Sequence, residues 1–360
     1  MSNFDDLKMA VESLTKGKNT VLLDDIGLPS IMVVWDPLKN SALLDSGSDV
    51  YHPGSVVGGD PKRMYISKYQ NVIMNERGYS LPMCDPETGV SYDRAVAVSR
   101  DKGRGWGLMP FSLWAQIALW CRKNVSPSYA TSRSMPRGNN SYGRDWYSQE
   151  DREGTPTKIS GGRIERIATG SGPITWNHNG LPDGIADLNG NVEEWCAGMR
   201  LMDGEIQVVP YANSMDPDVS LGASSTAWKA INAEGELVEP ESSGTLKYDW
   251  MSDKITLTTD AVSDEGTSNR GYYFRYLGIK SGLTAPEVAR AMILYPDDYG
   301  GYYYGDEEIS VKLAGEMVPR SGGSWLLNNK AGVFCTRFAT RSSYGSDTGF
   351  RSVYCDLSGN

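Results

Sequence analysis

Residues 320–351 read RSGGSWLLNNKAGVFCTRFATRSSYGSDTGFR, two regular ends around an irregular middle. The first end carries the glycine pair 322–323 and Trp325, and the last end is Gly-Phe-Arg. Glycines beside aromatic residues are typical of tight turns and close backbone packing. The middle shows neither a helical nor a strand period. We therefore expect a rigid frame that holds a chemically varied stretch, residues 324–347 (the display segment), outward as a recognition surface.

Composition restricts the partners of the chain. It has 360 residues, 39% of them hydrophobic, and a formal net charge of −10. Nucleic acids and anionic membrane surfaces are bound by concentrations of Lys and Arg, so we expect neither as a partner. The sequence contains no run of about 18 apolar residues, so we expect no transmembrane helix. The first twenty residues lack a basic stretch followed by an apolar one, so we expect no secretory signal.

Few side chains are available for metal or redox chemistry. The five cysteines form no CxxC pair, and the two histidines are His52 and His178. So few histidines and unpaired cysteines make a zinc site or a histidine-based catalytic site hard to assemble. We interpret the cysteines as free thiols.

Several helices and strands are predicted from hydrophobic patterns. Residues 1–30 begin with an amphipathic stretch that could pack on the body or on another subunit. IMVVWDPL, after Pro29, and MYISKYQNVIM (64–74) each read as a strand. Helices are predicted over 92–102 and 112–124. The second places Trp114, Ile117, Ala118 and Cys121 on one buried face, with Ser112 as N-cap.

The remaining chain is predicted to be richer in loops. Residues 125–180 are dominated by Ser, Gly, Asn, Pro and Arg and read as ordered loop. Residues 200–318 read as short strands between turns, with one helix over 283–294 after a Thr cap.

The segment DGIADLNGNVEEW (183–195) is rich in side-chain oxygens around glycines. Such a loop suits a hard cation such as Ca²⁺, although its spacing is not that of an EF-hand. The alternative is a tight turn whose Asn and Asp side chains bond the backbone. Spacing alone leaves both interpretations open.

Four segments together resemble the formylglycine-generating-enzyme (sulfatase-modifying factor) family. In chain order they are YISKYQN (65–71), SYDRAVAVSRDKGRGWGLMPFSLWAQIALWCR (91–122), GIADLNGNVEEW (184–195) and RSGGSW…GFR (320–351). The resemblance implies an α+β fold: a C-type-lectin-like fold of the formylglycine-generating subtype, with short mixed and antiparallel sheets, two main helices and extensive loops. It implies a C-type-lectin-like domain over 31–360 after an N-terminal segment, 1–30, with an insertion at about 200–318 and a variable region at about 322–351. It also implies a candidate structural calcium, held by Asp187, Gly190, Val192 and Glu194.

The enzymatic activities of that family do not carry over to this chain. Its copper enzymes use two cysteines, five apart, before an Ala-x-Arg triplet. Aligned on Ala339-Thr340-Arg341, those positions are Val333 and Phe338, and Cys335 is out of register. Related iron enzymes use three histidines, more than this chain contains. We therefore expect no catalysis and no required cofactor; a copper oxidase of this type with a displaced active site is the alternative.

A non-enzymatic branch of the same fold resembles the chain more closely: the variable proteins of diversity-generating retroelements of phages and bacteria. In these proteins a C-terminal region is rewritten at adenines of asparagine-rich template codons. Changing the first two bases of an Asn codon never yields Lys, Met, Trp, Glu or Gln, and residues 335–348 contain none of the five. Lys330 is not reachable in that way.

The resemblance implies a phage receptor-binding or display protein, located on a virion or a bacterial surface. A structural protein that decorates a virion is a further alternative. The expected partner is an unidentified protein or glycan receptor, and a homo-oligomer, a trimer by analogy, is a candidate assembly. The residues expected to bind the ligand are Ser324, Leu326, Leu327, Asn328, Lys330, Cys335, Arg337, Phe338, Thr340, Tyr344, Ser346 and Asp347.

Overall fold

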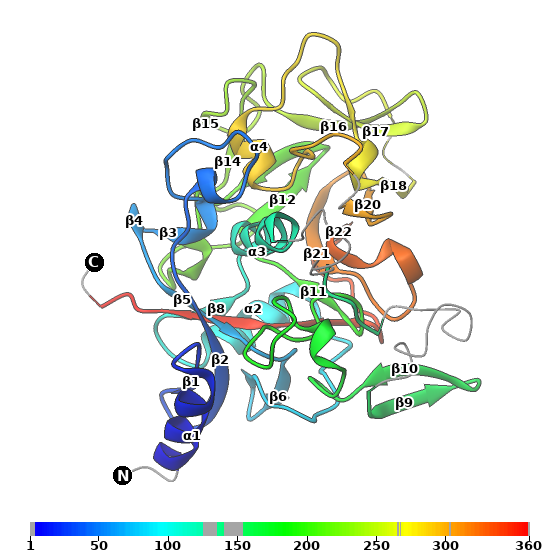
Figure 1. The fold of residues 1–360 in the computed structure, drawn as a ribbon. Coiled ribbons are helices and arrows are strands. Elements are labelled where there is room, and N and C mark those ends of the chain that lie inside the picture. The colour runs from blue at the N-terminus through cyan, green and yellow to red at the C-terminus, as the bar shows by residue number, and fades with distance from the viewer. Residues whose placement is uncertain are drawn as a thin grey trace.

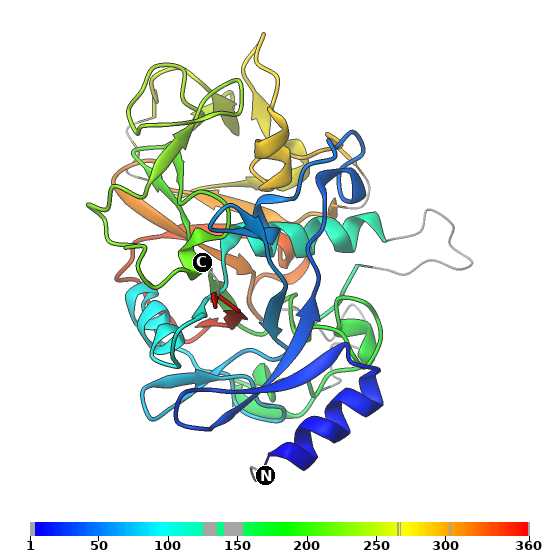
Figure 2. The same ribbon diagram turned by 90° about the vertical axis from the view of Figure 1, so that its left-hand side faces the viewer.

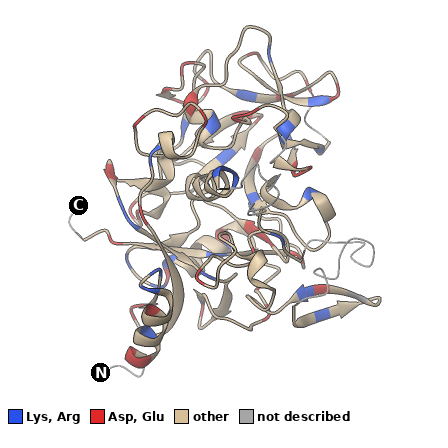
Figure 3. Ribbon diagram, in the orientation of Figure 1, with Lys and Arg blue, Asp and Glu red and all other residues tan. Residues whose placement is uncertain are grey.

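The computed structural model describes residues 4–124, 135–139, 154–264, 266, 268–301 and 304–358. They form an α+β fold of short, mainly antiparallel sheets, four α-helices and long loops (Figure 1). The α+β class with short, mainly antiparallel sheets predicted from the sequence is confirmed, and both helices expected over 92–102 and 112–124 are present. Within the described ranges, no helix is both long and apolar enough to cross a membrane. Figure 3 shows Lys and Arg interspersed with Asp and Glu along the ribbon.

One antiparallel sheet joins the two ends of the chain. Its order is β1-β2-β5-β24-β8. The strands are β1 (Asn19–Leu23), β2 (Pro29–Trp35), β5 (Met64–Ser67), β24 (Ser352–Cys355) and β8 (Trp106–Leu108). The single strand expected over 64–74 is wrong, because β5 ends at Ser67 and the separate hairpin β6 (Val72–Met74)–β7 (Arg77–Tyr79) follows. Between them Gln70 and Asn71 turn inward and bond buried groups instead of continuing the strand.

A larger sheet carries the display segment. Its main path is β18-β20-β22-β21-β12-β13-β16-β17-β19, and β11, β14, β15 and β23 branch from it. The bounds are β11 (Glu193–Trp195), β12 (Met199–Met202), β13 (Glu205–Val208), β14 (Lys229–Ile231), β15 (Leu237–Val238), β16 (Lys247–Met251), β17 (Lys254–Thr258), β18 (Arg270–Tyr273), β19 (Gly278–Ile279), β20 (Glu308–Val311), β21 (Glu316–Gly322), β22 (Gly332–Ala339) and β23 (Thr348–Phe350). The short strands expected over 200–318 are therefore present. Figures 1 and 2 both place most of residues 200–318 at the end of the molecule opposite helix α1 (Asp5–Thr15).

Helix α3 (Phe111–Lys123) forms the centre of the core. All four residues of its predicted apolar stripe are buried, and so are most residues on its other faces. The indole of Trp114 donates a hydrogen bond of 2.8 Å to the carbonyl of Val333 and so ties α3 to β22. The helix begins one residue before the predicted N-cap, because Pro110 takes the cap position and Ser112 lies inside the helix, bonded to the Tyr211 carbonyl. Helix α2 (Tyr92–Arg100) starts at the cap Ser91.

The smaller helices and hairpins differ in part from the elements predicted from the sequence. Helix α1 packs along β1, but none of its residues is fully buried. The helix expected over 283–294 shortens to α4 (Glu287–Ala291), capped by Pro286. Part of the loop expected over 125–180 lies outside the described residues, and the rest contains the hairpin β9 (Pro156–Ser160)–β10 (Arg163–Ile167). A second short hairpin pairs β3 (Val56–Val57) with β4 (Asp60–Pro61).

Candidate functional site

Three of the motifs identified in the sequence meet around one buried arginine. The side chain of Arg351 is fully buried and binds Glu194 through two hydrogen bonds, each 2.7 Å long. It also donates to the carbonyls of Ser67, at 2.8 Å, and Ala186, at 3.0 Å. The C-terminal Gly-Phe-Arg, the 183–195 loop and the end of β5 therefore share one charge-assisted network.

The 183–195 loop also fixes both ends of the display segment. The Gly190 N–H donates to the carbonyl of Gly322, and the Trp325 N–H donates to the carbonyl of Asn191. At the other end the Glu193 N–H donates to the carbonyl of Asp347 at 2.7 Å. These main-chain bonds do not depend on the side chains between the two ends, which leaves those side chains open to change.

The glycine pair is required by the backbone where β21 leaves the sheet. Gly322 has φ 88° and Gly323 has φ 69°, both in the left-handed region. A Cβ on Gly322 would lie 2.9 Å from the Leu188 carbonyl oxygen, and one on Gly323 would lie 2.7 Å from the Cβ of Ala331. The predicted role of the pair, close packing at a tight turn, is the one observed.

Most of the predicted ligand-binding side chains reach the surface. Leu326 is 39% exposed and Tyr344 is 74% exposed. Five of the predicted residues are exposed and four are half-buried: respectively Leu326, Lys330, Thr340, Tyr344 and Ser346, and Leu327, Asn328, Arg337 and Asp347. All of them except Arg337, which lies in β22, come from two loops, 324–331 and 340–347. The hydrogen bond of 3.1 Å from Ser324 to the carboxylate of Asp347 joins these loops at the frame.

Three predicted residues are buried and cannot form part of an exposed surface. Ser324 is inside because its hydroxyl links the two loops. Cys335 and Phe338 are inside because β22 is an interior strand, paired with β20 on one side and β21 on the other. Both sheet faces are covered as well, since the consecutive residues Val333 and Phe334, which point to opposite faces, belong to the main hydrophobic core together with Phe338. Sequence alternation could not show that both faces of this strand are covered.

A buried carboxylate anchors the half-buried Arg337. Glu193 is fully buried and forms ion pairs with Arg337 and with Arg320, the latter at 2.9 Å. Arg337 also lies 3.6 Å from the carboxylate of Glu308. The position of Arg337 is therefore set by Glu193 and Glu308. The sequence analysis placed Arg337 among the ligand-binding residues, but it could not reveal these two partners.

The four residues expected to hold calcium do converge, but on a side-chain amide. Gln70 Nε2 lies 3.1 Å from the Asp187 carbonyl oxygen, 3.3 Å from that of Gly190 and 3.0 Å from that of Val192. Its distance to Glu194 Oε1 is also 3.0 Å. The amide orientation is fixed, because Gln70 Oε1 accepts a hydrogen bond from Asn191 Nδ2. No pattern in the sequence indicated this role for Gln70.

The residues present do not fit a calcium ion. Calcium is usually held by several carboxylate oxygens, whereas here Glu194 alone supplies one. Both oxygens of Glu194 already bind Arg351, which neutralises its charge. Asp187 turns its carboxylate away to accept the Gly170 N–H at 2.7 Å, and burial raises the pKa of that carboxyl to about 6. The amide nitrogen occupies the centre where a cation would lie.

We predict that Gln70→Ala destabilises the protein and that calcium does not restore it. The variant leaves four oxygens facing a void, and an unsatisfied buried polar group costs about 1–3 kcal/mol. We expect a loss of roughly 2–3 kcal/mol in the free energy of unfolding, measured by urea denaturation. Wild type and variant should be unaffected by EDTA or by about 5 mM CaCl₂, a concentration that fills even weak sites.

Gln116→Ala is the matched control for that variant. Gln116 is also fully buried, but among the described residues its side chain has two side-chain partners, Trp35 and Ser55. We expect a smaller loss, about 1–2 kcal/mol. A calcium-dependent rise of more than roughly 2 °C in the Tm of the wild type would contradict the assignment of Gln70 to the centre of this loop.

A second buried carboxyl lies beneath β22. Glu307 accepts a hydrogen bond from the Phe334 N–H and lies against Gly332, where a Cβ would come within 2.3 Å of its carboxyl carbon. Burial raises its pKa to about 8, only partly offset by the N–H groups of Phe334 and Cys335. Strand β22 therefore packs against the carboxyl group of Glu307, whose environment favours the neutral, protonated form.

The thiols are poorly suited to redox or metal chemistry. All five cysteines are free, and four of them are buried. Burial raises the pKa of Cys335 and Cys196, and it raises that of Cys355 to about 11. Reactive thiols need the thiolate form at neutral pH, which these environments disfavour. Among the described residues, no group of three or more His, Cys, Asp or Glu side chains is placed to hold a metal ion.

Comparison with known proteins gives similarities to solved structures alone. No family model and no curated protein matches the chain. Treponema denticola variable protein 1 is similar at 11% identity and a TM-score of 0.36, covering 94% of this chain and 99% of its own. PvdO from Pseudomonas aeruginosa is similar at 13% identity and the same TM-score, covering 94% and 98%. At such values neither structure assigns a function to this chain.

Proposed function

We propose that this chain is a non-catalytic ligand-binding protein that presents a diversified C-terminal surface. One observation carries the proposal: the loops 324–331 and 340–347 expose chemically varied side chains, while their ends are fixed by main-chain bonds. Exposed Leu and Tyr beside adaptable polar groups are typical of binding surfaces. Such a surface can change its specificity without changing the fold.

The proposed partner is a protein or glycan receptor, and the proposed location is a virion or a bacterial surface. A net charge of −10 supports a partner other than nucleic acid. A phage receptor-binding or display protein uses a surface of this kind, and a trimer is the assembly we propose by analogy. No cofactor is required in this proposal, because the frame is held by Arg351, Gln70 and main-chain bonds.

The thiol environments support a protein without catalysis over a copper oxidase. An oxidase of the formylglycine-generating type needs two accessible thiolates, whereas Cys335 is fully buried within β22. Oxygen uptake by the purified protein with copper and a cysteine-containing peptide tests the alternative. Turnover that is lost in Cys335→Ser would overturn the proposal.

Sequencing sibling copies of the gene tests diversification directly. We expect differences clustered in the codons of the exposed residues between 324 and 347, at adenines of a nearby near-identical template. Codons for the buried residues Val333 and Phe334 should stay unchanged, because β22 packs them in the core. Uniform drift along the gene would instead support a structural decoration protein.

We predict that the exposed side chains can be replaced together without loss of stability. The triple variant Leu326→Ser, Tyr344→Ser, Ser346→Ala should change the free energy of unfolding by no more than about 0.5 kcal/mol, the usual range for surface substitutions. Phe338→Leu, within the same segment but buried, should cost about 1 kcal/mol. Urea denaturation compares the two. A triple variant that loses more than Phe338→Leu would show that these side chains maintain the fold.

A further inference from the structure

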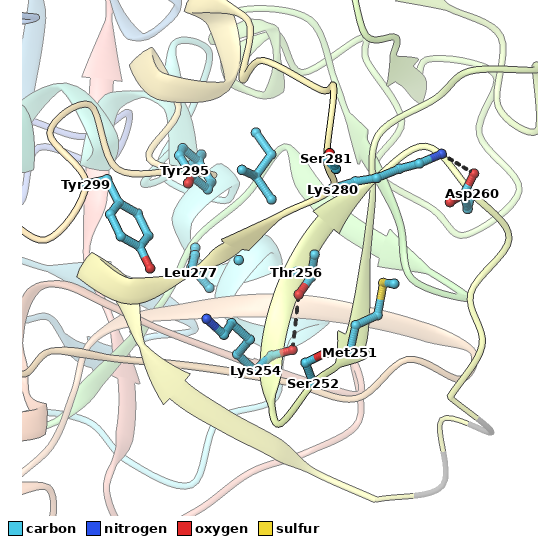
Figure 4. A pocket seen from close by; sticks show the side chains of 12 residues that line it. Met251, Ser252, Lys254, Thr256, Asp260, Leu277, Lys280, Ser281, Tyr295 and Tyr299 are labelled. Carbon is cyan, nitrogen blue, oxygen red and sulfur yellow. Dashed lines mark hydrogen bonds and ion pairs between the residues drawn. The ribbon is translucent and has the colours of Figure 1, made fainter.

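A groove in the insertion, remote in sequence from the display segment, has the features of a separate binding site. Its volume is about 690 Å³, within the range of small-molecule sites (roughly 300–1,000 Å³). The ends of β16 and β17, the strand β19 and the segment after α4 line it (Figure 4). We propose that this groove binds an acidic oligosaccharide, a chain of sugar rings that carries carboxylates.

Two tyrosines provide a surface for sugar rings. Tyr299 is 54% exposed, and its ring lies nearly parallel to that of Tyr295, at an interplanar angle of 16° and a centroid distance of 6.4 Å. Figure 4 shows both rings on the same side of the groove. An exposed, flat aromatic ring packs against the C–H face of a sugar, and its hydroxyl can bond the sugar's own hydroxyls.

One of these tyrosines has an unused hydroxyl. Tyr295 is only 9% exposed, whereas its hydroxyl reaches solvent, and no hydrogen bond joins that hydroxyl to any of the described residues. Because Tyr295 lines the groove, a ligand hydroxyl is well placed to supply that bond.

The charges of the groove favour an anionic ligand. Lys280 is paired with Asp260 at 2.5 Å, whereas no carboxylate among the described residues pairs with the ammonium of Lys254 (Figure 4). Lys254 is half-buried and lies beside the edge strand β19. A carboxylate on the ligand would provide its counter-charge, in a setting less screened than open water.

A peptide fits this groove less well than a glycan. Peptides that bind at a sheet edge extend the sheet through main-chain hydrogen bonds. The edge strand here, β19, has only two residues, too few to align a further strand. Hydroxyl-rich walls, which include Thr256 and Ser281, match sugar hydroxyls instead.

Binding of defined oligosaccharides tests the proposal. Two probes are titrated into the full chain by calorimetry at low salt: trigalacturonate and 3′-sialyllactose. At least one should bind with a Kd of about 1 mM or tighter, and the fully methyl-esterified trigalacturonate, which has the same rings without charge, should bind several-fold more weakly. Failure of both acidic probes to bind below about 5 mM would overturn the proposal, as would equal or tighter binding of hexaglutamate.

Three variants locate the binding site. Tyr299→Ala should weaken binding roughly 3- to 10-fold, from the lost ring contact. Lys254→Gln should remove the preference for the acidic probe over its methyl ester. Tyr344→Ala, in the display segment, should leave binding unchanged, so the result is independent of the function proposed above. Weaker binding by Tyr344→Ala with normal binding by Tyr299→Ala would place the sugar on the display segment and refute the groove.

Discussion

Replacing Arg351 with alanine should lower the free energy of unfolding by about 3–5 kcal/mol, the usual result of breaking a buried ion pair by removing one partner. The variant would leave Glu194 fully buried without a counter-charge. It would also leave the carbonyls of Ser67 and Ala186 without the N–H groups of the guanidinium. Since these groups come from distant parts of the chain, we expect global destabilisation in urea denaturation followed by tryptophan fluorescence.

Two companion variants make this result specific. Arg351→Lys keeps the charge but loses the two-pronged contact, so it should also be destabilised, though less than Arg351→Ala. Arg63→Ala removes an exposed ion pair with Asp36 and should cost no more than about 1 kcal/mol. The role assigned to Arg351 is refuted if its alanine variant is no less stable than Arg63→Ala.

Glu307→Gln should make the protein more stable at alkaline pH, with a gain that grows as the pH rises. The pKa of Glu307 is about 8 in the folded protein, against an ordinary value of 4.5. Below pH 4.5 both states hold the proton. As the pH rises towards 8 the unfolded chain releases its proton more readily, so the folded state of the wild type loses stability. At about 1.4 kcal/mol per pH unit, the full loss is on the order of 4–5 kcal/mol.

Comparing the two proteins at each pH isolates this group. Asp187, with a pKa raised to about 6 by burial, titrates in both proteins, and so does His52, whose pKa burial lowers to about 4. Their contributions cancel in the difference. Urea denaturation should give similar stabilities near pH 5 and a more stable Glu307→Gln variant near pH 9. A difference that stays constant with pH would mean that Glu307 ionises normally beneath β22.

Local sequence patterns were sufficient for several elements. The apolar spacing from Trp114 to Cys121 predicted α3 because a buried helix must place apolar residues every three or four positions. The glycine pair 322–323 marked a tight turn because its backbone conformation disfavours other residues. The strand after Pro29 followed from its β-branched residues. Each depends on neighbours within a few residues.

Long-range contacts decided what the patterns could not. The strand predicted over 64–74 was broken because Gln70 turns inward to oxygens more than a hundred residues away. The side-chain amide of Gln70 also lies at the centre of the four residues that were expected to hold calcium. The expected helix over 283–294 shortened around the proline cap at Pro286, with the segment beyond α4 packed as core.

The sequence by itself determined the α+β class, the central helices and the rigid borders of residues 320–351, because hydrophobic period and glycine conformation act locally. Only the tertiary structure decided which side chains between those borders face solvent. Cys335 and Phe338 are buried because β20, β21 and the core enclose β22, while Leu326 and Tyr344 lie in loops and stay exposed. Burial is a property of the neighbours that a strand acquires on folding, and those neighbours are distant in the chain.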